Sequence, residues 1–398
     1  MVLQSKTFAK RVTGGENAAP NKTESLSSRT FRTNFHRAAN YRRQRNNGPK
    51  TTKYAVEQAK RRSIMKSPTN TIRLSYPIRS SVVPPVDDVE MRGTLPSTQT
   101  QTVSRSFPIY LSRPDFVEVP VAAVEAIQPE LVKVDVSYIR DTLKMSTMGP
   151  SMFTVLRKST VKDKDVLSKG TLPREVSIIV DDMASVMPTH MLAVHGPSES
   201  HGDSKDSKAK VTLFPVHSII MAAHCANLPP FPPENEETEG KSSREIELPV
   251  RPLLLPSPKT FPFLLQYLYL RQPEGLLRYF LSTEVAVLFI DKLQHHDSLA
   301  RMMATKFSTG GLLQHMTVVH GMWQNACSLG VYDDDLWRAI DFAWKVLLMS
   351  LAISTGKTDV LESIRAAETA LGDEQEPEES SKSDEQESAP PSGSTATS

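Results

Sequence analysis

The 398-residue chain has little of what marks secreted and membrane proteins. It contains only two cysteines, Cys225 and Cys327, and both lie among apolar residues. A secreted protein of this size usually carries more cysteine, so a reducing compartment is favoured. No apolar run approaches the roughly 20 residues that cross a bilayer, and residues 1–11 lack the apolar segment of a secretory signal. We therefore predict a nuclear or, alternatively, a cytoplasmic protein without a membrane partner. The Arg- and Ser-rich start leaves a mitochondrial presequence as a minor alternative.

Motifs for catalysis are also missing. The sequence has no Gly-x-Ser-x-Gly, no phosphate-binding glycine loop and no clear nucleophile beside a base. Its glycine pairs, Gly14-Gly15 and Gly310-Gly311, lie in a polar arm and in a predicted turn between helices. These absences predict a non-enzymatic protein with no catalytic residue and no cofactor. An enzyme assembled from distant residues ranks last among the alternatives.

A few histidines and one cysteine form the best candidate for a metal site. His217 and His224 would lie about two turns apart on one helix, beside Cys225, and His295 and His296 follow later in the chain. Structural zinc normally needs four ligands, and neither a paired-cysteine motif nor His-Glu-x-x-His occurs. The favoured interpretation is a helix-capping histidine and a small buried thiol, so we predict that no metal is bound.

Charged residues are distributed unevenly, although the net charge is only +2. Residues 1–79 carry 18 Lys and Arg against three Glu, whereas residues 372–398 carry eight acidic residues and one Lys. A basic arm and an acidic tail indicate electrostatic contacts with partners. Two basic clusters in the arm are spaced like a bipartite nuclear import signal: Arg42, Arg43 and Arg45, then Lys60, Arg61 and Arg62.

The basic arm has two further interpretations. Its charge could contact nucleic-acid phosphates without sequence preference, or it could serve only to keep the protein soluble. Aromatic residues are too sparse there to form a platform on which bases stack, so we expect nucleic acid to be bound weakly or indirectly at most. Ser63 and Ser67 are candidate phosphorylation sites, and their modification would lower the positive charge of the arm.

The hydrophobic pattern separates an ordered middle from two polar ends. Polar segments without sustained periodicity cannot offset the entropy cost of ordering. The predicted parts are a disordered basic arm over 1–110, a partly ordered linker over 111–172 with a short helix near 129–143, a folded domain over 173–355, a terminal helix over 356–371 and a disordered acidic tail over 372–398.

Within the folded domain, β-branched runs predict strands and apolar residues at helical spacing predict helices. Gly330 is expected to end one helix, and Asp333 to begin the next, where negative charge is favourable. The fold class is therefore α+β, a small sheet extended by a C-terminal helical bundle. Strands are predicted over 175–180, 190–194, 211–216 and 246–255, and helices over 217–227, from Pro258 to 270, and over 284–307, 312–328, 333–354 and 357–371.

The sheet and its first helices carry a motif in two segments. The first segment, over 211–228, changes from strand to helix. The second, over 255–270, is a helix with a dense apolar face. Together they resemble the core of a BTB/POZ domain, which binds proteins and catalyses nothing. The chain departs from that pattern over 271–275, where the usual acidic and glycine positions are replaced. The core residues of the motif are Phe214, His217, Ile220, Phe261, Leu265, Leu268 and Tyr269.

A closer resemblance covers roughly residues 174–354. It depends mainly on the segment from Trp323 to Gly330, together with Asp335-Leu-Trp337 and Asp341-Phe-Ala-Trp344. These segments resemble the clampless proteins of basidiomycete fungi. The resemblance implies a regulator of clamp-cell formation, dikaryon development and cell-cycle progression after mating. It also implies protein contacts in the nucleus, with transcription factors or cell-cycle regulators as partners, and BTB-like folds often form homodimers.

Two other hypotheses stay open at this point. A BTB-like core could be the substrate adaptor of a cullin ubiquitin ligase, which co-purification with a cullin would reveal. The basic arm could make the protein a DNA-binding regulator, although no helix-turn-helix or zinc pattern supports this. A steeply salt-dependent DNA affinity that disappears with the arm would identify that function.

Overall fold

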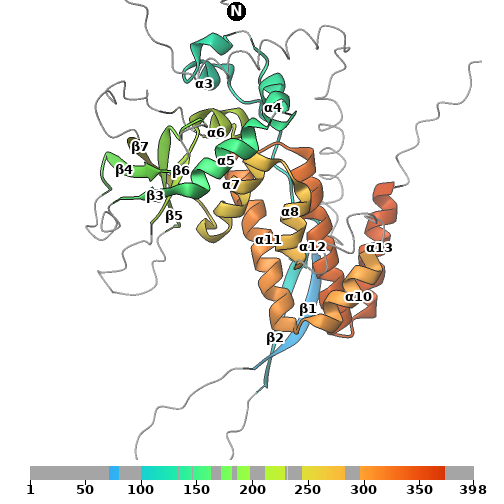
Figure 1. Cartoon of the computed structure of the whole chain (residues 1–398). Coiled ribbons are helices and arrows are strands. Elements are labelled where there is room, and N and C mark those ends of the chain that lie inside the picture. Colours follow the sequence, from blue (N-terminus) through green and yellow to red (C-terminus); the bar gives the residue numbers. More distant parts are fainter. Residues whose placement is uncertain are drawn as a thin grey trace, which may run out of the picture.

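The structure is a computed structural model, and it describes residues 71–79, 100–132, 134–145, 147–162, 172–181, 186–197, 211–228, 231, 244–282 and 296–372. In this part of the chain a five-stranded sheet with its helices lies beside a layer of longer helices (Figure 1). A two-stranded hairpin extends along the helical layer. The predicted α+β class is confirmed.

The five-stranded sheet contains all four predicted strands and one more. They are β4 (Glu175–Val180), β5 (His190–His195), β6 (Thr212–Val216) and β7 (Glu245–Leu254), joined by the short β3 (Ser159–Val161). The order is β3-β4-β7-β5-β6, and only β5 and β7 pair in parallel. Strand β5 is buried along almost its whole length, because both faces of this central strand are covered.

Alternate residues of the sheet pack into two apolar clusters on its opposite faces, because successive side chains of a strand point to opposite sides. Leu192 and Val194 of β5 belong to the large core that includes α6 (Ser218–His224) and α7 (Phe261–Leu270). Met191 instead packs into a smaller core with residues of β4 and β7 and with Val155 of α5 (Met148–Lys158). The sheet is therefore covered on both faces, with the two motif helices on the side of the larger core.

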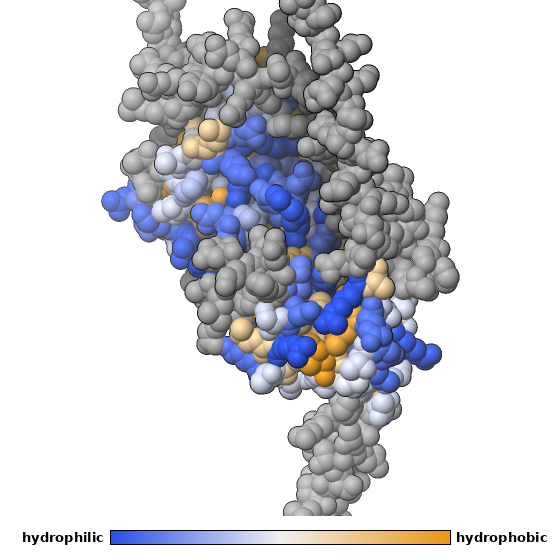
Figure 2. All heavy atoms as spheres, turned by 90° about the vertical axis from the view of Figure 1, so that its right-hand side faces the viewer, coloured by the Kyte–Doolittle hydropathy of each residue, from blue (hydrophilic) through white to orange (hydrophobic). Residues whose placement is uncertain are grey.

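The helical layer is centred on α12 (Asp334–Ser354). It contacts α8 (Pro273–Leu281), α10 (His296–Lys306), α11 (Thr309–Leu329) and α13 (Thr358–Gly372). Two-thirds of the residues of α12 are buried, which confirms the prediction of an internal helix. The described surface in Figure 2 is mainly hydrophilic, with apolar residues gathered near its lower end. Burial of the apolar residues of α12 shows that most of them point inward.

The predicted ends of α11 and α12 are confirmed by their local geometry. Gly330 ends α11 in the left-handed region, with φ at 65°. Asp333 caps α12, because its carboxylate accepts a hydrogen bond from the backbone N–H of Leu336 at 2.9 Å. Of the predicted helix over 284–307, the described part is α10, and residues 283–295 lie outside the described residues.

Part of the region predicted to be a disordered arm is a β-hairpin. Strands β1 (Thr71–Arg79) and β2 (Thr100–Pro108) pair in antiparallel register. Ile72, Leu74 and Tyr76 alternate with polar residues and are buried. This period of 2 is short, and it is stabilised by burial against distant residues of the helical layer, so local composition alone underestimated it. Residues 1–70, 80–99 and 373–398 lie outside the described part.

The described residues between 111 and 162 are also more ordered than predicted. The helix expected near 129–143 is divided into η2 (Pro129–Leu131) and α4 (Val136–Met145), and it is preceded by α3 (Val121–Glu125). The additional helix α5 crosses α7 closely, because a Cβ on Gly149 would lie 2.4 Å from the backbone oxygen of Tyr269. The described part of this segment belongs to the folded unit because many of its apolar residues, among them Val124, Ile139 and Met152, are buried in the main core.

Candidate functional site

The predicted import and phosphorylation residues cannot be placed. Arg42, Arg43, Arg45, Lys60, Arg61, Arg62, Ser63 and Ser67 all lie outside the described residues. Their proposed roles stay predictions from the sequence.

The BTB-like motif residues form one packed junction between the sheet and α7. Phe214 is half-buried and meets Phe261 edge to face, with ring centroids 5.3 Å apart. Ile220, Phe261, Leu265, Leu268 and Tyr269 are buried. These side chains are used in packing, as the sequence pattern predicted for a structural core.

His217 and Tyr269 join the start of α6 to α7 by hydrogen bonds. The backbone N–H of His217 donates to the Tyr269 hydroxyl at 2.8 Å, and the His217 Nδ1 lies 2.9 Å from the same oxygen. The His217 Nε2 lies 3.0 Å from the carbonyl oxygen of Val186, which can only accept. The neutral ring therefore carries its proton on Nε2 and accepts from the tyrosine at Nδ1. Burial lowers the pKa of His217 to about 4, so the neutral form persists at physiological pH.

The metal hypothesis finds no support in this geometry. His217 occupies the N-cap position of α6, but its ring bonds to Tyr269 and Val186 instead of capping the helix. His224 lies at the opposite end of α6, and the ring of His296 packs against Phe342. Among the described residues, no group of three His, Cys, Asp or Glu side chains could hold a metal ion. Burial raises the pKa of Cys225 to about 12, so this thiol stays protonated.

The three tryptophans of the clampless-like segments connect the helical layer to the chain before it. The indole N–H of Trp344 donates to the Pro108 carbonyl at 3.0 Å, and that of Trp323 donates to the Ser112 carbonyl at 2.5 Å. Trp337 donates to Val331 and is fully buried. Trp323 and Trp344 thus hold the end of the hairpin against α11 and α12, whereas Trp337 binds the loop just before α12, and all three have a structural role.

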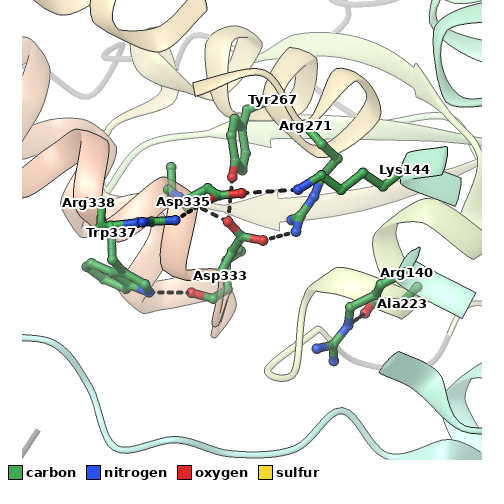
Figure 3. A network of polar contacts seen from close by, with 11 residues as sticks. Arg140, Lys144, Ala223, Tyr267, Arg271, Asp333, Asp335, Trp337 and Arg338 are labelled. Atoms are coloured by element: carbon green, nitrogen blue, oxygen red, sulfur yellow. Dashed lines mark hydrogen bonds and ion pairs between the residues drawn. The ribbon is translucent and has the colours of Figure 1, made fainter. Parts of the chain in front are cut away.

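A buried polar network joins the end of α7 to the start of α12 (Figure 3). The Asp333 carboxylate accepts hydrogen bonds from the Tyr267 hydroxyl and forms an ion pair with Arg271. Nearby, Asp335 pairs with Lys144 at 3.2 Å and with Arg338. The network therefore connects the motif helix to the helical layer through one buried carboxylate.

Arg271 lies in an unusual backbone conformation. It ends α7 with φ at 54°, in the left-handed region that glycine adopts without strain. The sequence pattern after Tyr269 departs from the BTB pattern at this place, where an arginine stands among the replaced positions. A non-glycine residue here costs on the order of 1 kcal/mol or more. The arginine side chain forms the ion pair with Asp333 and lies over the ring of Tyr267.

A second arginine, Arg140, is bound at the end of α6. The Nε of Arg140 donates to the carbonyl oxygen of Ala223 at 2.6 Å, which places this arginine at the end of α6 (Figure 3). Burial, then Arg271 and then Arg140, lower the pKa of His224 well below its ordinary value. Sequence analysis missed the contact between Arg140 and Ala223, because the two residues are far apart in the chain and no local motif connects them.

An open groove lies between α7 and α8. Its walls include Phe263 and Tyr279, whose rings stack with centroids 3.3 Å apart, and its floor includes the buried Tyr267 and Leu276. The groove is open to solvent, and the side chains that line it are apolar, aromatic or uncharged polar groups.

Comparisons with known proteins identify the family. The N-terminal domain of clampless protein 1 matches residues 114–256, and its C-terminal domain matches residues 254–391. Clampless protein 1 of Cryptococcus neoformans var. neoformans serotype D, in strains JEC21 and B-3501A, is 28% identical over 109 residues, which are 27% of this chain and 21% of each relative. The chain thus spans about a fifth of the length of these curated relatives.

Two further findings limit what the comparisons add. No solved structure matches the chain, so the BTB/POZ likeness of the core stays a prediction. No helix in the described ranges is long and apolar enough to cross a membrane. The two domain matches are adjacent, follow each other in order and together cover most of the chain. The chain therefore belongs to the clampless protein 1 family.

Proposed function

We propose that the protein is a non-enzymatic regulator of sexual development in a basidiomycete fungus. It would control clamp-cell formation, dikaryon development and cell-cycle progression after mating. The observation that carries this proposal is the match of both clampless protein 1 domains over residues 114–391. The regulator would act in the nucleus by binding transcription factors or cell-cycle regulators.

The packing of the motif side chains inside the fold supports a function in which other residues, at the surface, bind partner proteins. The aromatic and histidine side chains that carry both resemblances are packed or hydrogen-bonded within the fold. Such residues hold the domain together, so partner recognition depends on side chains outside them. Affinity purification with mass spectrometry from mating-competent cells would identify the partners. Repeated recovery of enzymes of one metabolic pathway, without any regulatory protein, would contradict the proposal.

Gene replacement tests the developmental role. The coding sequence is deleted in both mating partners, and clamp cells and nuclear number are scored after mating. We expect clamps to be absent and to return when the full chain is supplied again. A strain rescued with a variant of the exposed Arg278, Arg278→Gln, provides a matched control for expression. Normal clamp formation in the deletion strain would overturn the proposal.

The nuclear location is tested separately through the arm. Arg42, Arg43, Arg45, Lys60, Arg61 and Arg62 are all changed to Gln in one variant. A control variant carries the same change at six other basic positions of the arm: Arg11, Arg29, Arg32, Arg37, Lys50 and Lys53. Both variants lose the same charge, so only an import signal predicts that the first alone leaves the nucleus. Equal nuclear accumulation of the two would refute the import role.

A cullin adaptor is the second candidate function. It is favoured by the arrangement of the BTB-like segments, since β6 leads into α6 and α7 binds the start of α6 through Tyr269 and His217. Co-purification with a cullin would support it, and partners without any cullin would favour the developmental regulator acting directly. DNA binding by the arm is tested by the dependence of affinity on salt, with and without residues 1–70.

A further inference from the structure

The segment that follows the hairpin lies on the helical layer as an extended strap, which we define as residues 108–113. Its residues after Pro108 belong to no helix or strand. Their side chains alternate in burial, and the buried ones are Ile109, Leu111 and Arg113. The two apolar residues are part of the large core. This period of 2 is that of an extended chain with one face against a surface.

The helical layer holds the strap at both ends through its main chain. Trp344 of α12 donates its indole N–H to the carbonyl oxygen of Pro108, and Trp323 of α11 donates to that of Ser112. An indole N–H can only donate, and here it binds a backbone oxygen whatever side chain that residue carries. In sites that bind extended peptides, main-chain hydrogen bonds give affinity and alternate side chains give specificity. The strap is bound in this manner.

One contact depends on a particular side chain of the strap. The guanidinium of Arg113 pairs with the Asp341 carboxylate of α12 at 2.6 Å and lies 5.7 Å from the centre of the Trp337 ring. The Arg113 side chain is 2% exposed and that of Asp341 is 19% exposed. An acidic group in place of the arginine would face a carboxylate at close range, which is strongly unfavourable. We call Trp323, Asp341 and Trp344 the docking face.

The docking face and the strap differ in their relation to the family domains. All three residues of the face lie within 254–391, the range that matches the C-terminal domain of clampless protein 1. The strap ends at Arg113, one residue before the match to the N-terminal domain begins. The face is therefore part of a family domain, and the segment that fills it lies outside both matched ranges. Another chain could use the same face once the strap leaves it.

We propose that the docking face is a peptide-binding site that the strap occupies in cis, and that an extended segment of a partner protein displaces the strap. The partner segment would carry two bulky apolar residues at alternate positions and an arginine two residues later, as Ile109, Leu111 and Arg113 do. This inference gives the proposed regulator a binding surface. Its test uses a peptide of the chain itself, so the result does not depend on the developmental role.

The covalent tether decides how easily the strap is displaced. A segment attached to the same chain acts at an effective concentration on the order of millimolar, so a free segment of equal sequence competes poorly. A partner overcomes this advantage by adding contacts elsewhere. A change that loosens the strap and leaves the docking face intact should therefore expose the site to a free peptide.

Binding is tested with a fluorescent peptide of residues 107–116 and the purified full-length protein, followed by anisotropy. The test variant is Arg113→Glu, which sets the strap against Asp341. The control is Arg73→Glu, the same charge change at an exposed position of β1. We expect R113E to bind the peptide at least tenfold more tightly than the unchanged chain or R73E does. A peptide that itself carries the R113E change should bind the same variant at least tenfold more weakly.

Charge exchange makes the test specific to the docking face. The double variant R113E/D341R restores an ion pair between strap and face with the charges exchanged, so the gain in affinity for the original peptide should disappear. Equal affinity of R113E and R73E, or of the two peptides, would overturn the inference. If far-UV circular dichroism shows that R113E is unfolded, Arg113→Gln replaces it. R113Q is then expected to bind the peptide several-fold more tightly than the unchanged chain, and no gain would refute the proposal.

Hydrogen exchange and light scattering identify where the peptide binds and what else occupies the face. At a peptide concentration on the order of millimolar, the amides of residues 109–113 of the unchanged chain should exchange faster, whereas those of β4 should not. Unaltered exchange in the strap would place the peptide elsewhere and contradict the inference. A dimer of R113E that excludes the peptide would assign the face to a second copy of the chain, and would overturn the proposal of a separate partner.

Discussion

Replacement of Asp333 by Asn tests whether one buried carboxylate joins the two halves of the fold. The Asp333 side chain is 8% exposed and interacts with Tyr267, Arg271 and the N–H of Leu336. The Asn side chain keeps an acceptor for the helix cap but leaves the Arg271 charge without its partner. Breaking one side of a buried ion pair costs about 3–5 kcal/mol. This is a large part of the roughly 5–15 kcal/mol that stabilises a typical domain.

The assay is urea unfolding of the full-length protein, followed by tryptophan fluorescence. Asp335→Asn is the matched control, because its pairs with Lys144 and Arg338 are more exposed and worth about 0–1 kcal/mol. A double-mutant cycle with Arg271→Met completes the test. We expect R271M/D333N to be more stable than D333N alone, since the double variant removes both charges. A D333N loss within about 0.5 kcal/mol of that of D335N would refute the argument.

Three other perturbations have defined outcomes. The pKa of His217 is lowered from 6.5 to about 4 in the folded chain. As the pH falls below 6.5, His217 therefore binds a proton in the unfolded chain before it does so in the folded chain. The free energy of unfolding should therefore decrease between pH 6.5 and 4, by up to about 3 kcal/mol, and urea midpoints should depend less on pH in His217→Gln. Gly149→Ala should destabilise the fold by about 1–3 kcal/mol through overlap with the backbone of Tyr269, whereas Gly275→Ala, whose Cβ would contact nothing within 4 Å, should be neutral or stabilising in thermal unfolding. Trp344→Phe removes the hydrogen bond to Pro108, so hydrogen exchange should accelerate in β1 and β2 but not in β4, and uniform exchange across all three strands would contradict the role of Trp344.

The core of the fold could be predicted because its signals are local. The strands from β4 to β7 have β-branched or apolar runs, and α12 has a continuous apolar stripe that begins after Asp333. Gly330 ends α11 because glycine alone adopts a positive φ without strain. Each of these features depends on a few neighbouring residues, so the sequence alone was sufficient.

The remaining features depend on residues that only the folded chain brings together. The hairpin of β1 and β2 is marginal by itself and is held by Trp344 and by burial against the helical layer. Asn325 binds the backbone at Ser257 with both atoms of its amide, at 3.0 and 2.7 Å, a contact that no spacing rule indicates. The roles of the basic arm and the acidic tail stay predictions from charge alone.

The amino-acid sequence by itself determined the α+β class, the buried helices and the family of this protein. The periodicity and the clustered tryptophan and aspartate residues of the C-terminal half are properties of neighbouring positions. Only the tertiary structure placed Arg140 against the carbonyl oxygen of Ala223 and Asp333 beside Arg271 as its buried carboxylate partner. The reason is that electrostatic energy depends on distance and burial, and neither is encoded by separation along the chain.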